Sequence, residues 1–90
     1  MKAADRPFLP RGVRLHHDRV RGVPVLLGPE TALILDPVGQ AVLAEVDGRR
    51  DIAAISAVLA ERYAAPVEMI QSDVIEFLDD MAARRLVEVA

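Results

Sequence analysis

The chain contains no cysteine and very few aromatic residues. Without thiols it can form no disulfide, no thiolate metal site and no cysteine nucleophile. Its only aromatic side chains are Phe8, Tyr63 and Phe77, so the core must consist mainly of Ala, Val, Leu and Ile. No apolar run approaches the roughly 20 residues that cross a bilayer, and residues 1–10 lack the apolar stretch of a signal peptide. We therefore expect a cytoplasmic protein that has no membrane partner.

Acidic residues dominate the average charge, since 14 Asp and Glu against 11 Lys and Arg leave a net charge of −3. Such a field repels phosphate backbones, which argues against nucleic acid as a partner. The basic residues are unevenly placed, because six of them precede Gly22 whereas most acids follow it. This polarity would steer an acidic partner toward the N-terminal quarter of the chain.

The first third of the chain carries strand patterns. Residues 1–12 contain two prolines and no periodicity, which predicts a flexible N-terminal arm, and residues 13–90 are expected to form one domain. Apolar and polar residues alternate over 13–17, as in a half-buried strand, and residues 23–28 and 31–35 supply two more strands. The short links between them predict an antiparallel meander with the second strand in the middle.

Helix patterns fill most of the remainder. Asp36-Pro37 is a strong helix start, because the carboxylate can cap free amides and proline is favoured at the first helical position. The three helices are expected over 36–46, 51–63 and 67–84, and residues 86–89 have a short strand pattern. This order indicates an α+β, winged-helix-like domain: a three-stranded antiparallel sheet followed by three helices and a short extended C-terminal tail.

Candidate catalytic groups are few and badly placed. His16 and His17 are neighbours in a strand, so their side chains point to opposite faces and cannot easily hold one ion. Asp79 and Asp80 are about 100° apart on a helix and do not form a facing acid and base pair. The sequence has no nucleophile elbow, phosphate loop or dinucleotide fingerprint. We therefore predict no catalytic residue, no metal site, no cofactor and no enzymatic activity.

A winged-helix regulator of DNA is the alternative function. Two helices joined by a short turn after small strands can form a helix-turn-helix, with the third helix as the reader. The exposed side of that helix would carry five acids and only two terminal basic residues, which would repel phosphate at every contact. The charge pattern therefore favours a different kind of partner.

Several segments, taken in order, resemble the PqqD family. The resemblance covers nearly everything from Val13 to Val89. Over residues 29–63 it rests on the strand Thr31-Ala32-Leu33-Ile34-Leu35 after Pro29-Glu30, and on Asp47-Gly48-Arg49-Arg50 followed by Ile52, Ile55, Leu59 and Tyr63. Over residues 73–87 it rests on Asp73-Val74-Ile75-Glu76-Phe77-Leu78 and on the closing pair Leu86-Val87. One departure is Arg85, where family members often have Gly.

This resemblance implies a peptide chaperone of pyrroloquinoline quinone (PQQ) biosynthesis. It would bind the precursor peptide PqqA and present it to the radical S-adenosylmethionine enzyme PqqE, in which the iron-sulfur chemistry would reside. The family is similar to the recognition elements of ribosomally made, post-translationally modified peptides (RiPPs), which have a winged-helix-like fold. The chain itself would need no cofactor.

The residues themselves suggest where a peptide would bind. The third strand of a three-stranded meander is an edge, and Thr31 to Leu35 contains no Pro or Lys to block an added strand. On the third helix, Ile70, Val74, Phe77 and Met81 form one apolar stripe, and three neighbouring residues widen it into a shoulder: Ile75, Leu78 and Ala82. We expect the peptide between the strand Thr31, Ala32, Leu33, Ile34, Leu35 and that shoulder. The acids Asp73, Glu76 and Asp80 are expected well away from the apolar stripe. The same free edge would also allow a homodimer.

Overall fold

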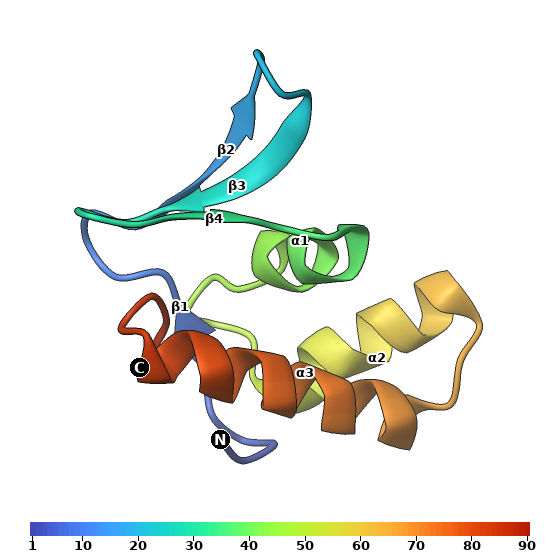
Figure 1. Cartoon of the computed structure of the whole chain (residues 1–90). Coiled ribbons are helices and arrows are strands. Elements are labelled where there is room, and N and C mark those ends of the chain that lie inside the picture. The colour runs from blue at the N-terminus through green and yellow to red at the C-terminus, as the bar shows by residue number, and fades with distance from the viewer.

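All 90 residues are described by the structure, which is a computed structural model (Figure 1). Its elements follow in the order β1 (Pro7–Phe8), β2 (Arg14–Asp18), β3 (Val23–Leu27), β4 (Ala32–Ile34), α1 (Pro37–Ala44), α2 (Ile52–Tyr63), α3 (Val67–Ala83) and β5 (Glu88–Val89). The predicted α+β class and the order of three strands, three helices and an extended tail are confirmed. None of the helices is both long and apolar enough to span a membrane.

The main sheet has the predicted order β2-β3-β4 and is antiparallel throughout. Asp18 organises the turn after β2, since its Oδ1 accepts hydrogen bonds from the backbone N–H groups of Val20 and Arg21 at 2.9 and 3.2 Å. Gly22 closes this turn with a φ of +68°, a conformation that glycine adopts without steric cost. Figure 1 shows the β2-β3 hairpin projecting away from the helices.

Two aspartates begin the first two helices, as predicted. Asp36 accepts a hydrogen bond from the N–H of Gly39 at 2.7 Å, and Asp51 accepts one from the N–H of Ala54 at 2.8 Å. Each bond satisfies an amide that has no partner within its helix. The first helix ends at Ala44, two residues earlier than the sequence suggested.

An aliphatic core joins the sheet to the three helices. Figure 1 shows the sheet on one side, α2 and α3 on the other, and α1 between them. Twelve buried side chains form one cluster: Leu26, Leu35, Val42, Leu43, Ile52, Ile55, Leu59, Val74, Leu78, Met81, Leu86 and Val87. None of them is aromatic, in agreement with the composition.

The first twelve residues do not form the free arm that the sequence suggested. Pro7–Phe8 forms β1, which pairs antiparallel with β5 at the other end of the chain. Further backbone bonds hold this segment to the domain, from Gly48 N–H to the Pro7 carbonyl and from Ile52 N–H to the Asp5 carbonyl, at 2.8 and 2.9 Å. Two-residue strands carry too little pattern to be recognised, and their pairing depends on chain ends that only the folded core brings together.

The end of α3 is closed by a left-handed residue. Arg85 has a φ of +63°. The N–H of Leu86 donates to the Met81 carbonyl and that of Arg85 donates to the Ala82 carbonyl, both at 2.9 Å. This is the Schellman arrangement, in which glycine usually occupies the left-handed position. The arginine therefore keeps the tail geometry at some cost in backbone strain.

Candidate functional site

The strand β4 is one of the two outer strands of the sheet and has a neighbour on one side only. It pairs with β3 alone, through Val25 with Ile34, Leu26 with Leu33, and Leu27 with Ala32. Its residues Ala32, Leu33 and Ile34 include no Pro or Lys, which are the usual devices that block an edge. The strand is therefore open to pairing with another extended chain.

The hydrogen bonds that flank β4 reveal which of its backbone groups are free. Just before it, Gly28 N–H donates to the Thr31 carbonyl at 2.8 Å, and just after it, Leu35 N–H donates to the Pro24 carbonyl at 2.9 Å. Thr31 and Leu35 thus occupy hydrogen-bonded positions of the antiparallel ladder, and such positions recur at every second residue.

Leu33, midway between those two positions, must also direct its N–H and C=O toward β3. Ala32 and Ile34 alternate with it and therefore direct theirs toward the open edge. Four backbone groups, two donors and two acceptors, are available there to an added strand. The backbone groups free to bind a peptide thus belong to Ala32 and Ile34, whereas the sequence suggested that all residues from Thr31 to Leu35 contribute to the binding edge.

A shallow groove of about 190 Å³ runs between β4 and α3. Five of its seven lining residues are hydrophobic: the groove is lined by Leu33, Ile34, Leu35, Asp36, Phe77, Met81 and Arg84. Ile34 contributes most of the exposed apolar surface on the strand side, because 59% of it is accessible. The groove lies between the strand and the helix that the sequence analysis paired.

The helix wall of this groove differs from the expected one. Phe77, Met81 and Arg84 are spaced by four and three residues and so share one helix face. The predicted Leu78 has no exposed surface and belongs to the core, while Ile75 and Ala82 are half-buried and line none of the pockets. Adjacent apolar stripes lie only about 100° apart on a helix, and the sequence alone does not show which of them faces the sheet edge.

Phe77 owes its position to a glycine on α1. A Cβ atom added to Gly39 would lie 3.2 Å from two atoms of the Phe77 ring, which is tighter than ordinary van der Waals contact. Glycine inside a helix costs about 1 kcal/mol relative to alanine, so its presence there indicates a close approach of another group. Gly39 was thus a sequence signal that another group packs closely on α1, and the structure identifies that group as Phe77.

A second pocket, of about 170 Å³, lies between the three helices. Eight of its nine lining residues are hydrophobic: Val38, Ala41, Val42, Leu59, Tyr63, Ile70, Val74 and Phe77, together with Asp73. Phe77 lines both this pocket and the groove beside β4. The two hollows are therefore neighbours, separated by one aromatic ring.

The acids of α3 lie closer to the groove than the sequence suggested. Asp73, Glu76 and Asp80 share a shallow depression with Phe77, and Asp73 also lines the pocket between the helices. Asp80 is paired with Arg84 at 3.4 Å, whereas Asp73 and Glu76 take part in no ion pair. The expectation that all three lie well away from the apolar stripe that contains Phe77 has to be corrected, because they border Phe77.

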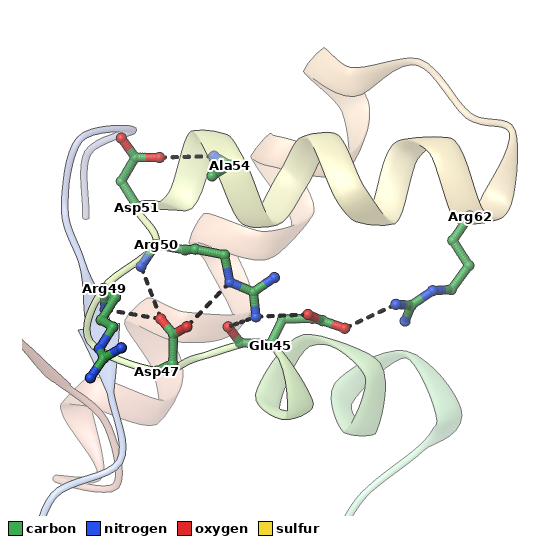
Figure 2. A network of polar contacts seen from close by, with 7 residues as sticks. All are labelled: Glu45, Asp47, Arg49, Arg50, Asp51, Ala54 and Arg62. Carbon is green, nitrogen blue, oxygen red and sulfur yellow. Dashed lines mark hydrogen bonds and ion pairs between the residues drawn. The ribbon is translucent and has the colours of Figure 1, made fainter.

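A network of charged groups fixes α1 relative to α2 (Figure 2). Glu45, just after α1, accepts bonds from Arg50 and from Arg62 of α2, each at 2.9 Å. Arg50 also donates to the Glu45 carbonyl and pairs with Asp47. Arg50 is thus a structural residue, while the Arg49 side chain points away from the network in Figure 2. Both α1 and α2 supply walls of the pocket, so the network helps to maintain its shape.

Hydrogen bonding shifts the ionisation of this network. Bonds from Arg62 and Arg50 hold the pKa of Glu45 below its ordinary value. The backbone N–H groups of Arg50 and Arg49 lower the pKa of Asp47, and the bond to Glu45 raises the pKa of Arg50. Glu45, Asp47 and Arg50 therefore remain charged near neutral pH, and their ion pairs persist there.

The two histidines lie away from both hollows of α3. His16 and His17 are exposed neighbours on β2, opposite Val25 and Pro24 of β3. The structure brings together no group of three or more His, Asp or Glu side chains that could hold a metal ion. The arrangement around α3 is suited to binding an extended apolar chain.

A family model described as "Coenzyme PQQ synthesis protein D (PqqD)" matches residues 25–87 of the chain. The chain is also 46% identical over 81 residues to a "PqqA binding protein" of Rhizobium meliloti (strain 1021), covering 90% of this chain and 83% of that protein.

Solved structures agree with this similarity. The solution structure of the PqqD part of Methylobacterium extorquens PqqCD, described as a functional, stand-alone RiPP recognition element, has a TM-score of 0.84 and 41% identity, covering 97% of this chain and 93% of that one. TbiB1 in complex with the TbiA(beta) leader peptide has a TM-score of 0.76 at 22% identity, covering 90% and 94% of the two chains, and this shows a shared fold. The predicted winged-helix-like arrangement is therefore confirmed.

Proposed function

The chain belongs to the PqqD family, and from that premise we propose that it binds the precursor peptide PqqA at the free edge of β4 and presents it to the enzyme PqqE. It acts as a non-catalytic chaperone, so the chemistry on the peptide takes place in PqqE. The observation that carries the proposal is the juxtaposition of an unpaired strand edge with an apolar groove on α3.

Strand addition explains how such a site would recognise a peptide. Backbone bonds to the outward groups of Ala32 and Ile34 would give affinity for any extended chain, since they do not depend on side chains. Side chains on one face of the added strand would enter the groove against Phe77 and Met81, which would select apolar residues at alternate positions. The neighbouring Thr31, Leu33 and Leu35 hold β4 in place through β3.

The charge on α3 disfavours the DNA-binding alternative. Asp73, Glu76, Asp79 and Asp80 are all exposed on this helix, and a helix with this charge would repel the phosphates flanking a major groove. A peptide that offers backbone groups and apolar side chains meets no such penalty.

Titration of the isotopically labelled protein with synthetic PqqA tests the proposal. We expect the largest amide shifts at residues 31–36 and 77–84, and smaller shifts, at higher peptide concentration, with a scrambled peptide of the same composition. Shifts confined to the turn at residues 18–22 or to α2 would place the peptide elsewhere. Co-elution of PqqE with the chain, measured with and without PqqA, tests the presentation step.

The free edge also offers a route to a homodimer. Two copies pairing through β4 would occupy the same backbone groups that the peptide needs, so dimer and peptide complex would exclude each other. Sedimentation at rising protein concentration should then show a dimer that PqqA dissociates. A dimer that persists in saturating peptide would have to use another surface.

A further inference from the structure

The pocket between α1, α2 and α3 is open at the surface. Val38 and Tyr63, which stand on its rim, are 61% and 50% exposed, although both are large and partly or wholly apolar. Such side chains gathered around one hollow are uncommon on a monomeric protein and mark a place where another molecule packs. Neither residue takes part in the strand edge or the groove beside it.

The groove beside β4 and this pocket adjoin each other. The groove contains Asp36, the N-cap of α1, and the pocket contains Val38 on the first turn of the same helix. Phe77 forms a wall of both. A chain that leaves the β4 edge beyond Ile34 and passes Phe77 therefore arrives over the pocket.

The charge of the pocket restricts what would fill it. Asp73 is its one charged lining residue, and neither Asp73 nor the adjacent Glu76 has a cationic partner within the protein. An acidic side chain would be repelled there, and a purely apolar one would partly desolvate the Asp73 carboxylate without compensation. A long aliphatic side chain that ends in a positive charge can pack its methylene groups on the apolar wall and place its charge beside the Asp73 carboxylate.

We propose that this pocket receives a lysine or arginine side chain of the bound peptide, whose methylene stem packs on Val38, Tyr63 and Phe77 and whose charge lies beside Asp73. The inference rests on the proposed function and adds to it a specificity element. Strand pairing at β4 accepts many sequences, whereas this pocket selects peptides that have a Lys or Arg residue next to the paired segment.

A double-mutant cycle between protein and peptide tests this assignment. Each Lys and Arg of synthetic PqqA is replaced in turn by Met, which retains an unbranched apolar chain but removes the charge. Affinities are measured by calorimetry for the wild type, for Asp73→Asn, and for Glu68→Gln as the matched control. Glu68 is an exposed acid of the same helix that lines neither this pocket, nor the groove beside β4, nor the depression beside Phe77.

We expect one Met replacement to weaken binding to the wild type about fivefold, the upper range for an exposed ion pair. The same replacement should cost nothing further in Asp73→Asn, should cost the full amount in Glu68→Gln, and should matter less at high salt. In the wild-type complex, nuclear Overhauser contacts should join the methylenes of that basic residue to the Tyr63 ring.

Two results would overturn the assignment and are distinct from each other. If every Met replacement has the same effect on the wild type and on Asp73→Asn, and no basic residue contacts Tyr63, the pocket does not read charge although the peptide still binds. If wild-type protein fails to bind PqqA at all, the proposed function is refuted and the inference with it. The contacts to Tyr63 decide the question even if Asp73→Asn changes the stability of the domain.

Discussion

The alternation of backbone groups along β4 predicts opposite outcomes for proline at two adjacent positions. Ala32 directs its N–H toward the open edge, whereas Leu33 directs its N–H toward β3. Ala32→Pro therefore removes a donor that only a bound peptide would use, and the first residue of an edge strand tolerates proline well. Leu33→Pro removes a bond of the sheet itself.

The magnitudes follow from burial. Leu33→Pro leaves the carbonyl of Leu26, a residue with no exposed surface, without its donor, which costs about 1 to 3 kcal/mol. Loss of the half-buried Leu33 side chain adds to this, so the midpoint of thermal unfolding should fall by more than about 10 °C. Ala32→Pro should change the free energy of unfolding by no more than about 0.5 kcal/mol, yet the lost bond should weaken peptide binding about fivefold.

Thermal denaturation and calorimetric titration with PqqA separate the two effects, and Ala32→Ser, which keeps the N–H, serves as the control. A folded Ala32→Pro variant that binds PqqA as tightly as the wild type would refute strand addition at β4. A Leu33→Pro variant of unchanged stability would show instead that Leu33 does not direct its N–H toward β3, and that the assignment of inward and outward groups along β4 is wrong.

Three further predictions concern stability. Arg85→Gly should raise the free energy of unfolding by about 0.5 to 1 kcal/mol, because the relief of left-handed backbone strain exceeds the stabilising entropy that glycine adds to the unfolded chain. An unchanged urea midpoint would mean that the arginine is not strained. Ser56→Ala should stabilise by about 1 kcal/mol, because the buried Ser56 hydroxyl has no hydrogen-bond partner, and a loss of similar size would reveal a partner. The lowered pKa of Glu45 means that its contribution to stability is complete above about pH 4.5 and disappears as the pH falls through the lowered value. The stability difference between the wild type and Glu45→Gln should therefore shrink on acidification. A constant difference would contradict a stabilising role for the ion pairs of Glu45 with Arg50 and Arg62.

Local signals made most of the elements predictable. The aspartates at 36 and 51 mark helix starts because a short carboxylate can bond the free amides of the first turn, whatever surrounds them. Alternation over β2, two further strand segments at residues 23–28 and 31–35, and the short turns between them were sufficient for the order of the sheet. These interactions involve residues close in sequence, so they could be recognised before any packing was known.

The candidate site was only partly predictable, because it depends on how each helix is rotated about its own axis and therefore on which side chains face the groove. The sequence indicated that β4 and α3 would flank a groove, yet Leu78, predicted as a wall, is core, and Phe77 takes its place. A turn of about 100° about the helix axis separates these two residues, and it is set by how α3 packs on α1 at Gly39.

The sequence by itself determined the class of the domain, its acidic third helix, its open edge strand and its family. Only the tertiary structure decided which groups those elements present. The β3-β4 register directs Ala32 and Ile34 outward, long-range pairing ties Pro7–Phe8 to Glu88–Val89, and the meeting of three helices places Asp73 on an apolar pocket. The last two of these features join residues far apart in the chain. Their geometry is fixed by the packing of the whole core, which no local pattern encodes.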